Sequence, residues 1–279
     1  EVPAIYAGKD SRARHDRAAA LLALVEPGDE VLVLDPSYDS YAAAVALAGA
    51  VGRDAFAGPA LANLQASGID LSRVVRLDAP TGCAAICTDP AGRNQIAVAA
   101  GANRLARASQ VEDALLTPAT ILVLQMECDP DETAALVHRA RARGARILLN
   151  LAPAAPLPGD ALRLVNLLIV NEHEAAWLGA PDAAALHRTL GVGVIRTMGG
   201  AGAEYAVAGD AGHVPSYPVQ VVDTTGAGDA YAAGFLAAHA AGRQLAACGR
   251  LGSLAAAAAI GAYGARPAVD LRAMAASVG

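Results

Sequence analysis

The segment from Asp223 to Asp229, with the sequence Asp-Thr-Thr-Gly-Ala-Gly-Asp, places two carboxylates, two hydroxyls and two glycines directly before the apolar stretch 230–240. This order predicts a loop that leads into a helix, whose first turn has unpaired backbone N–H groups that bind anions. The glycines allow the backbone to approach a phosphate closely. We therefore predict that the amides of residues 226–228 form an anion hole and that Asp229 is a base.

Transfer of a phosphoryl group requires donors that neutralise the moving phosphate, a metal ion that bridges nucleotide oxygens, and a base for the proton of the accepting hydroxyl. The segment 223–229 has the residue types for the donors and for the base. An alternative fits the same residues: Gly226 and Gly228 make a tight turn, and Asp229 only caps the helix.

Two further polar clusters follow predicted strands. Residues 197–202, Thr-Met-Gly-Gly-Ala-Gly, come after the strand 192–196, where nucleotides bind in open α/β sheets, although an ordinary glycine turn fits them as well. Asn171 and Glu174 follow the strand 167–170. They suit a water or Mg²⁺ near phosphates, and they equally suit a helix cap with its capping-box partner.

Strands and helices that alternate along the chain must position these residues. The predicted strands are 120–124, 146–150, 164–170 and 192–197, and the first helix between them is 132–143. Because the strands are apolar throughout, they suit a parallel sheet that is covered on both faces. We predict an α/β fold with a doubly wound, mostly parallel sheet and helices on both faces.

Other segments add to this core. Residues 204–208 and 214–222 are predicted as antiparallel strands, and helices are predicted from residue 228 and over 244–263. Residues 82–98 predict a β-hairpin around a Pro-Ala-Gly turn, which would serve as a lid or an interface. Near the N-terminus, a strand at 30–34 is predicted between helices at about 16–25 and 40–49.

Composition argues against several classes of protein. The net charge of −6 comes from interspersed acidic and basic residues, so there is no basic stripe for a nucleic acid. No apolar run approaches the roughly 20 residues that a membrane span requires. The four cysteines lack CxxC spacing, which argues against a zinc site or a disulfide framework. Since residues 1–4 lack the features of a signal peptide, we expect a cytoplasmic location.

Taken together, the polar clusters resemble motifs of the ribokinase family of carbohydrate kinases, also called the PfkB family. Segment 223–229 resembles the C-terminal signature of that family, Asn171-xx-Glu174 its Mg²⁺ and phosphate motif, and segment 197–202 its nucleotide loop. Further similar segments are Pro80-Thr81-Gly82, Gly92-x-Asn94-x-Ile96, Gly101-Ala102-Asn103, Gln125-Met126-Glu127 and Asn150-x-Ala152-Pro153. The resemblance runs from about residue 51 to the C-terminus.

The resemblance implies an ATP-dependent sugar kinase that converts ribose to ribose 5-phosphate. It implies Asp229 as the general base, and the amides of Gly226, Ala227 and Gly228 as the anion hole. Glu127, together with Asp229, would contact the sugar.

The same resemblance implies the remaining ligands. The residues expected at ATP are Asn171, Thr197, Gly199, Gly202, Gly228 and, near the adenine, Ser253. Glu174 would hold Mg²⁺ through water, and Asp223, Thr225 and Gly264 would hold a monovalent cation, K⁺. The hairpin at 82–98 resembles half of a lid through which such kinases pair, so a homodimer is expected.

The N-terminal part departs from this family. Neither the Asn-x-Asp nor the Gly-Gly-Lys-Gly-x-Asn motif, which the family uses to bind the sugar, occurs in the sequence. Residues from about 6 to 49 resemble instead a fragment of a fold-type I aminotransferase. Because Lys9 is the only lysine and lies outside the motif that would form a Schiff base, pyridoxal phosphate chemistry is not expected. We expect residues 1–50 to pack in one domain with the kinase part, 51–279.

Two functions therefore stand side by side. One is a ribokinase-like sugar kinase whose activity is impaired by the missing sugar motifs. The other is a chimeric or degenerate nucleotide-binding protein without kinase activity. Since a site that leaves sugar hydroxyls unpaired loses affinity and orientation, we expect ATP binding to survive better than ribose phosphorylation.

Overall fold

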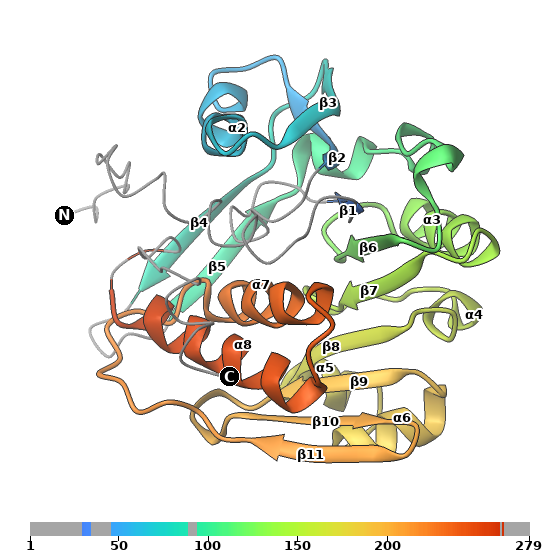
Figure 1. Cartoon of the computed structure of the whole chain (residues 1–279). Coiled ribbons are helices and arrows are strands. Elements are labelled where there is room, and N and C mark those ends of the chain that lie inside the picture. The colour runs from blue at the N-terminus through green and yellow to red at the C-terminus, as the bar shows by residue number, and fades with distance from the viewer. Residues whose placement is uncertain (1–29, 35–45, 89–93, 263, 265–279) are drawn as a thin grey trace.

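A computed structural model describes residues 30–34, 46–88, 94–262 and 264 of the chain (Figure 1). Among these residues, one sheet has the strand order β11-β10-β9-β8-β7-β6-β1-β2-β3. Its strands are β1 (Glu30–Leu34), β2 (Ala46–Gly52), β3 (Asp70–Leu77), β6 (Thr120–Leu124), β7 (Arg146–Asn150), β8 (Leu167–Asn171), β9 (Gly193–Thr197), β10 (Ala203–Val207) and β11 (Asp210–Val214). All neighbours from β9 to β3 are parallel, and only β10 and β11 add antiparallel pairs. The predicted α/β fold with a mostly parallel sheet is confirmed.

Strand β1 lies between β6 and β2 and is parallel to both, so the segment 30–34 is part of the central sheet. The predicted helix at about 40–49 is wrong at its end, because residues 46–52 form β2. Residues 47–52 are all buried. Burial between β1 and β3 outweighs the helix preference of the alanines in this strand. Gly52 has no room for a side chain, since a Cβ there would lie 2.2 Å from the carbonyl oxygen of Ala79.

The predicted strand 214–222 is also wrong, because the chain returns earlier. It turns at Gly209, where φ is 79°, and residues 210–214 pair at once with β10. Pro215 and Pro218 then follow, and proline has no N–H to donate to a strand ladder.

The other predicted elements differ from the structure by a few residues at their ends. The strand expected from residue 164 starts at Leu167, and the helix expected over 244–263 spans 245–260. The helix expected at about 16–25 lies outside the described residues.

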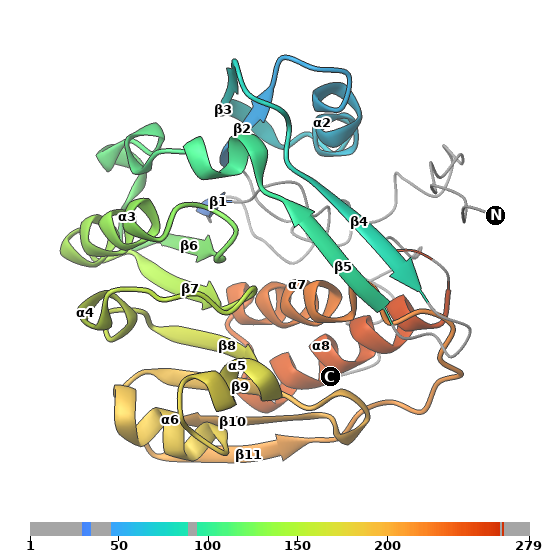
Figure 2. The same ribbon diagram turned by 180° about the vertical axis from the view of Figure 1, so that it is seen from behind.

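Helices cover both faces of the sheet, as Figures 1 and 2 show. The α-helices are α2 (Ala57–Ala66), α3 (Pro130–Ala142), α4 (Gly159–Leu162), α5 (Glu172–Trp177), α6 (Ala183–Leu190), α7 (Ala227–Ala240) and α8 (Leu245–Ile260). Short 3-10 helices are η2 (Gly101–Leu105), η3 (Ala108–Gln110), η4 (Asp113–Leu115) and η5 (Gly199–Ala201). Helices α7 and α8 lie on one face, and α3 to α6 lie on the other.

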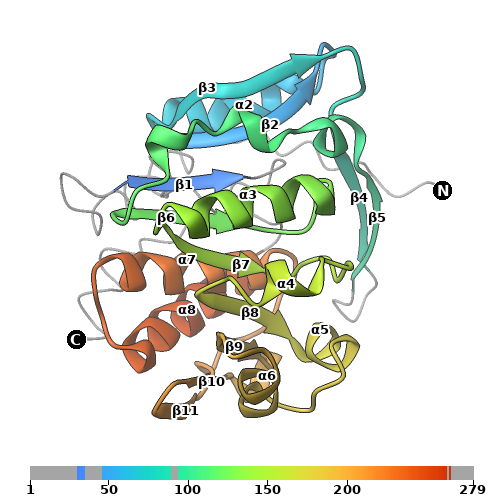
Figure 3. The same cartoon turned by 90° about the vertical axis from the view of Figure 1, so that its right-hand side faces the viewer.

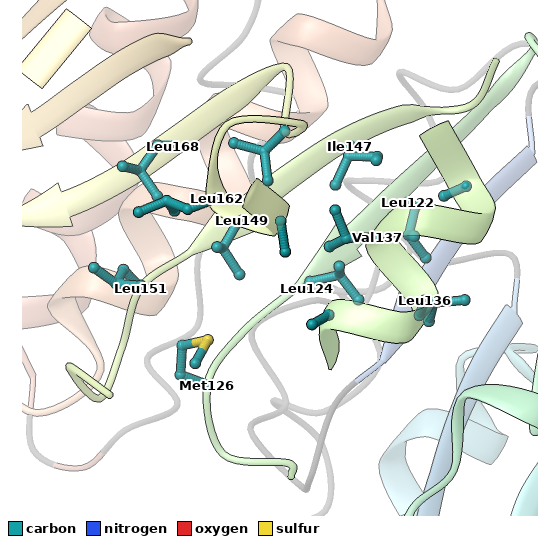
Figure 4. Close-up of a cluster of buried hydrophobic side chains, with 14 of the residues drawn as sticks. Leu122, Leu124, Met126, Leu136, Val137, Ile147, Leu149, Leu151, Leu162 and Leu168 are labelled. Atoms are coloured by element: carbon teal, nitrogen blue, oxygen red, sulfur yellow. The ribbon is translucent and has the colours of Figure 1, made fainter. Parts of the chain in front are cut away.

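Two hydrophobic clusters, one on each face, hold the helices to the sheet. Successive side chains of a strand point to opposite faces, so Ile121 joins the cluster with α7 and α8 while Leu122 joins the cluster with α3 and α4. Figure 4 shows the second cluster, in which Leu122 and Leu124 face Leu136 and Val137 of α3. Each buried leucine contributes on the order of 1.5–3 kcal/mol relative to exposure.

Glycines bring helices α7 and α8 into backbone contact. A Cβ on Gly234 would lie 2.8 Å from the carbonyl oxygen of Leu251, and a Cβ on Gly252 would lie 2.9 Å from that of Tyr231. Real Cβ atoms do not approach other atoms this closely, so any side chain at either position would push the two helices apart.

The hairpin of β4 (Cys83–Thr88) and β5 (Asn94–Ala99) leaves the sheet after β3 and forms a separate two-stranded sheet. Figure 3 shows it crossing the edge of the molecule toward which the arrows of β1 and β3 point. At its root, the Asp54 carboxylate accepts hydrogen bonds from the backbone N–H and the hydroxyl of Thr81, both at 2.7 Å. The Thr81 hydroxyl in turn accepts from the N–H of Gly52 at 2.9 Å. These bonds fix the point at which the hairpin leaves the sheet.

Candidate active site

The polar residues predicted from the sequence lie at one edge of the sheet. Glu127 follows β6, Asn171 is the last residue of β8, and Thr197 is the last residue of β9. The register pairs Asn171 directly with Thr197. Because the carboxyl ends of parallel strands share an edge, this is where open α/β sheets bind ligands.

The start of α7 leaves backbone donors open. Gly226 precedes the helix with φ 76° and ψ 5°, a left-handed conformation that suits glycine, and no side chain caps the helix. Within the described chain, the N–H groups of Gly226, Gly228 and Asp229 donate to no protein acceptor, whereas that of Ala227 donates to the Thr224 carbonyl at 3.3 Å. Open donors at the positive end of a 14-residue helix can bind an anion.

Asp229 lies in the first turn of α7 and has a strongly perturbed acidity. Burial, the larger cause, and the negative charge of Glu127 together raise the pKa of Asp229 from 3.8 to about 7. Glu127 therefore lies within electrostatic range of Asp229. A carboxylate with a pKa near neutrality can accept a proton at physiological pH.

Glu127 is held by its neighbours on the loop after β6. Its backbone N–H donates to the side-chain oxygen of Gln125, and the N–H of Met126 donates to the Ala152 carbonyl at 3.1 Å. Burial raises the pKa of Glu127, and the positive charge of Arg104 opposes that rise. Glu127 is therefore partly buried, and its carboxyl group lies within electrostatic range of Arg104.

Arg104 is a residue of the site that sequence reasoning missed. Its guanidinium donates to the Cys128 carbonyl at 3.3 Å and acts on the charge of Glu127. In the sequence, Arg104 is marked only by its position directly after the Gly101-Ala102-Asn103 motif. A single arginine at such a position does not by itself predict a site residue.

The loop before α7 is folded around Asp223. The Asp223 carboxylate accepts the N–H of Thr225 and the N–H of Gly264, each at 2.9 Å. Burial alone would raise the pKa of Asp223, but these hydrogen bonds outweigh it and the pKa is lowered. The structure thus brings together the three residues predicted to hold a monovalent cation. The Asp223 carboxylate is the group in this set whose chemistry suits a cation.

Asn171 and Glu174 form a closed capping box at the start of α5. The Asn171 side-chain oxygen accepts the N–H of Glu174 at 2.9 Å, and Glu174 accepts the N–H and the side-chain amide of Asn171 at 2.7 and 2.9 Å. Burial raises the pKa of Glu174 against the hydrogen bonds from Asn171 and the charge of His173. Each carboxylate oxygen keeps a further lone pair, so Glu174 fits a role in which it binds Mg²⁺ through water.

The loop 198–202 after β9 is tightly closed. The N–H of Met198 donates to the Gly202 carbonyl at 2.8 Å, and the Ser216 hydroxyl donates to the Gly200 carbonyl at 2.6 Å. Gly202, with φ 88°, must be glycine, since a Cβ would lie 2.1 Å from the Val214 carbonyl oxygen. Ser253, by contrast, is buried within α8 at 6% exposure, so its predicted contact with adenine would need a path between side chains.

Two negative findings hold for the described residues. No group of three or more His, Cys, Asp or Glu side chains there is arranged to hold a metal ion by itself. Nor does that part of the chain contain a helix long and apolar enough to cross a membrane.

Comparison with known proteins agrees with the geometry. The sequence pattern of the pfkB family carbohydrate kinases matches residues 39–271, and so includes residues 39–49 that had been grouped with the aminotransferase-like segment. The ribokinase of Schizosaccharomyces pombe is 32% identical over 218 residues, which are 72% of this chain and 69% of that protein. The ribokinase of Bacillus subtilis is 31% identical over 237 residues, or 82% and 80% of the two chains. The chain spans 66% of the length of the Staphylococcus aureus ribokinase.

Solved structures share the fold. The ribokinase of Thermotoga maritima superposes with a TM-score of 0.73 at 26% identity, over 84% of this chain and 80% of that one. The ribokinase of Arabidopsis thaliana, solved with ribose and ATP, has a TM-score of 0.75 at 23% identity, over 95% and 85% of the two chains. The family pattern over residues 39–271 and the relatives at 31–32% identity show that the chain belongs to the pfkB family of carbohydrate kinases.

Proposed function

We propose that this kinase transfers the γ-phosphate of ATP to a primary hydroxyl of a sugar, ribose O5, with Asp229 as the general base. The observation that carries the proposal is the pair of Asp229, with its pKa near 7, and the open N–H groups beside it at the start of α7. The base and the anion site lie within one turn of helix, so a hydroxyl and a phosphate can be held next to each other. General-base catalysis of this kind contributes roughly 10²–10⁴-fold to a rate.

The acid–base balance of the site supports this role. Glu127 and the buried surroundings keep the pKa of Asp229 near neutral, which makes it a stronger base than an ordinary carboxylate. When a sugar hydroxyl lies against Asp229, the carboxylate accepts its proton as the hydroxyl oxygen bonds to the γ-phosphorus of ATP. The bond from that phosphorus to the β,γ-bridging oxygen breaks at the same time, and ADP leaves. The open amides of Gly226 and Gly228 then stabilise the charge on the transferred phosphate.

ATP would lie along the same edge of the sheet. The residues that fit its phosphates and ribose are Asn171, Thr197 and the loop 198–202, which follow adjacent strands. When bound, Mg²⁺ would neutralise phosphate charge, with Glu174 holding it through water, and K⁺ would sit at Asp223, Thr225 and Gly264. Use of ATP supports a cytoplasmic location.

A coupled assay that measures ADP release with ribose, ATP, Mg²⁺ and K⁺ tests the proposal. Ribose-dependent turnover should appear in the native chain and be lost in Asp229→Asn. Turnover that the substitution leaves unchanged contradicts the assignment of Asp229.

A second candidate is nucleotide binding without turnover. It is favoured by the sequence, which contains neither the Asn-x-Asp nor the Gly-Gly-Lys-Gly-x-Asn sugar motif and so provides fewer hydrogen bonds to a sugar. Calorimetric titration of ATP separates the two candidates, since binding without ADP release supports only the second.

The hairpin supports a homodimer. Ile96 and Val98 on β5 are 43% and 53% exposed, and among the described residues their strand pairs only with β4, which leaves its other edge open. Light scattering should give twice the mass of one chain, and Val98→Lys should give the mass of one chain.

A further inference from the structure

Arg196 is a charged residue in an otherwise apolar strand. It is the fourth residue of β9, after Val194 and Ile195, and only 14% of its side chain is exposed. Its guanidinium Nη1 lies 3.0 Å from Glu204 Oε1 and 3.1 Å from the sulfur of Met198, and Nη2 lies 3.8 Å from Glu172 Oε1. A buried charge requires such partners, because its desolvation costs several kcal/mol.

The partners of Arg196 belong to separate segments at the edge of the sheet proposed to bind ATP. This edge, which includes Asn171, Glu174, Thr197 and the loop 198–202, is called the nucleotide edge below. Met198 starts the loop 198–202, and Glu172 is the first residue of α5, inside the capping box of Asn171 and Glu174. Glu204, on β10, also accepts the N–H of Ala183 at the start of α6. One guanidinium therefore joins the loop after β9 to the helix after β8.

Arg196 lies next to residues proposed to contact ATP, but its side chain is on the other face of the sheet. Arg196 and Thr197 are adjacent in the strand and point to opposite faces, and Asn171 is paired with Thr197 in the register. Arg196 therefore lies on the face of α5 and α6, one residue from Thr197, and acts on the nucleotide edge only through the segments it holds.

This arrangement costs stability. Within the described chain, Nε of Arg196 is buried and has no hydrogen-bond partner, and an unsatisfied buried donor costs about 1–3 kcal/mol. An apolar residue would continue the pattern of Val194 and Ile195 without that cost. Proteins break packing rules chiefly at functional sites, so a buried charge with an unsatisfied donor points to a role in function.

We propose that Arg196 is a positioning residue for the nucleotide: it keeps the loop 198–202 aligned with Asn171 and Glu174. The inference rests on the proposed use of that edge for ATP. It does not require that the chain phosphorylate a sugar.

Calorimetric titration with ATP and Mg²⁺, on the native chain and on Arg196→Leu, tests the inference. The dissociation constant should rise about 3- to 10-fold in Arg196→Leu, which corresponds to about 0.7–1.4 kcal/mol. Arg196→Lys keeps the charge but not the fork geometry, so its constant should lie between those of the other two proteins. If the chain turns over ribose, KM for ATP should rise and KM for ribose should stay the same.

Arg139→Leu is the matched control. Arg139 on α3 also donates to several acceptors, the carbonyls of Ala108 and Val111 and the Asp113 carboxylate, but it lies away from the nucleotide edge. Arg139→Leu should lower Tm without changing the affinity for ATP. The inference is overturned if Arg196→Leu binds ATP as tightly as the native chain, whether its Tm rises or falls. Loss of ribose turnover alone, with the ATP affinities ordered as expected, contradicts the proposed function and leaves the inference standing.

Discussion

Helices α5 and α7 both begin at the edge of the sheet proposed to bind the nucleotide, yet their first turns differ in how the backbone N–H groups are hydrogen-bonded. At α5 the capping box of Asn171 and Glu174 satisfies the backbone and side-chain donors within the protein. At α7 no side chain caps the helix, and Gly226 turns the chain so that N–H groups stay open. A helix start that is closed by its own side chains presents a carboxylate, and one that is left open presents backbone donors.

The difference shows that two helix starts in one fold can present different chemical groups to a ligand. The open start offers N–H groups to an anion, and glycine allows the left-handed turn at Gly226 that leaves them open. The closed start holds Glu174 in a fixed orientation at a buried position, through its hydrogen bonds with Asn171. Each start would lose its role if it were built like the other.

The largest difference in kcat should come from replacing the carboxylate by an amide at each helix start, in two separate variants. Asp229→Asn removes the base and should lower kcat by roughly 10²–10⁴-fold, whereas Glu174→Gln keeps the base and should lower kcat far less. Steady-state ADP release measures both. Asp210→Asn, at the exposed first residue of β11, serves as a neutral control. Equal losses at 229 and 174 would remove the distinction between the two starts.

A smaller effect should follow from straining the open start. Gly226→Ala forces an alanine to adopt φ 76°, which costs on the order of 1–2 kcal/mol and shifts the open amides. We expect kcat/KM to fall by about 10- to 100-fold, part of what the loss of one anion-hole donor costs. Gly242→Ala is matched, because Gly242 has φ 70° beyond the other end of α7. It should lose similar stability in a thermal melt and keep its activity.

Opening the closed start should have a moderate effect. Asn171→Ala removes the capping oxygen and should cost roughly 0.5–2 kcal/mol of stability, with a several-fold rise in KM for ATP. Asp182→Ala removes the cap of α6, whose carboxylate accepts the Ala185 N–H at 2.6 Å, and should cost similar stability. KM for ATP should stay unchanged in that control. A rise in both variants would mean that stability, and not position, controls nucleotide binding.

The smallest effect concerns pH. Because Glu127 helps to raise the pKa of Asp229 to about 7, kcat/KM should rise with pH through neutrality as Asp229 loses its proton. Glu127→Gln removes the negative charge, so the pKa of Asp229 should fall and the acidic limb of the profile should move to lower pH. The position of that limb is the readout, since sugar affinity also changes. A limb that moves to higher pH contradicts the proposed coupling.

The same raised pKa gives a test by stability. The folded state holds the Asp229 proton more tightly than the unfolded state does, so this group is neutral for stability below about pH 4 and destabilises the fold as pH rises toward 7. Asp229→Asn should therefore raise Tm at pH 8 more than at pH 5. Differential scanning calorimetry at the two values decides this, and an equal effect at both would show that the acidity is unperturbed.

Sequence reasoning succeeded where the pattern was long and local. The apolar strands and the motif 223–229 could be placed from the sequence, because strand periodicity and glycine spacing are properties of short segments. It failed at residues 46–49, where alanine favours a helix and only burial between β1 and β3 makes a strand. It also missed Arg104 and Arg196, since their partners come from segments distant in the chain and no spacing encodes them.

The glycine contact between α7 and α8 has a consequence for how the kinase tolerates sequence change. Gly252 lies on α8, a helix that carries neither the base nor the anion hole, yet a single methyl there would meet the backbone of Tyr231, two residues after Asp229 in the chain. Helix α7 would then shift relative to α8, and Asp229 in its first turn would move with it. A variant at position 252 would present in a kinetic screen as an active-site defect, with its cause on the neighbouring helix.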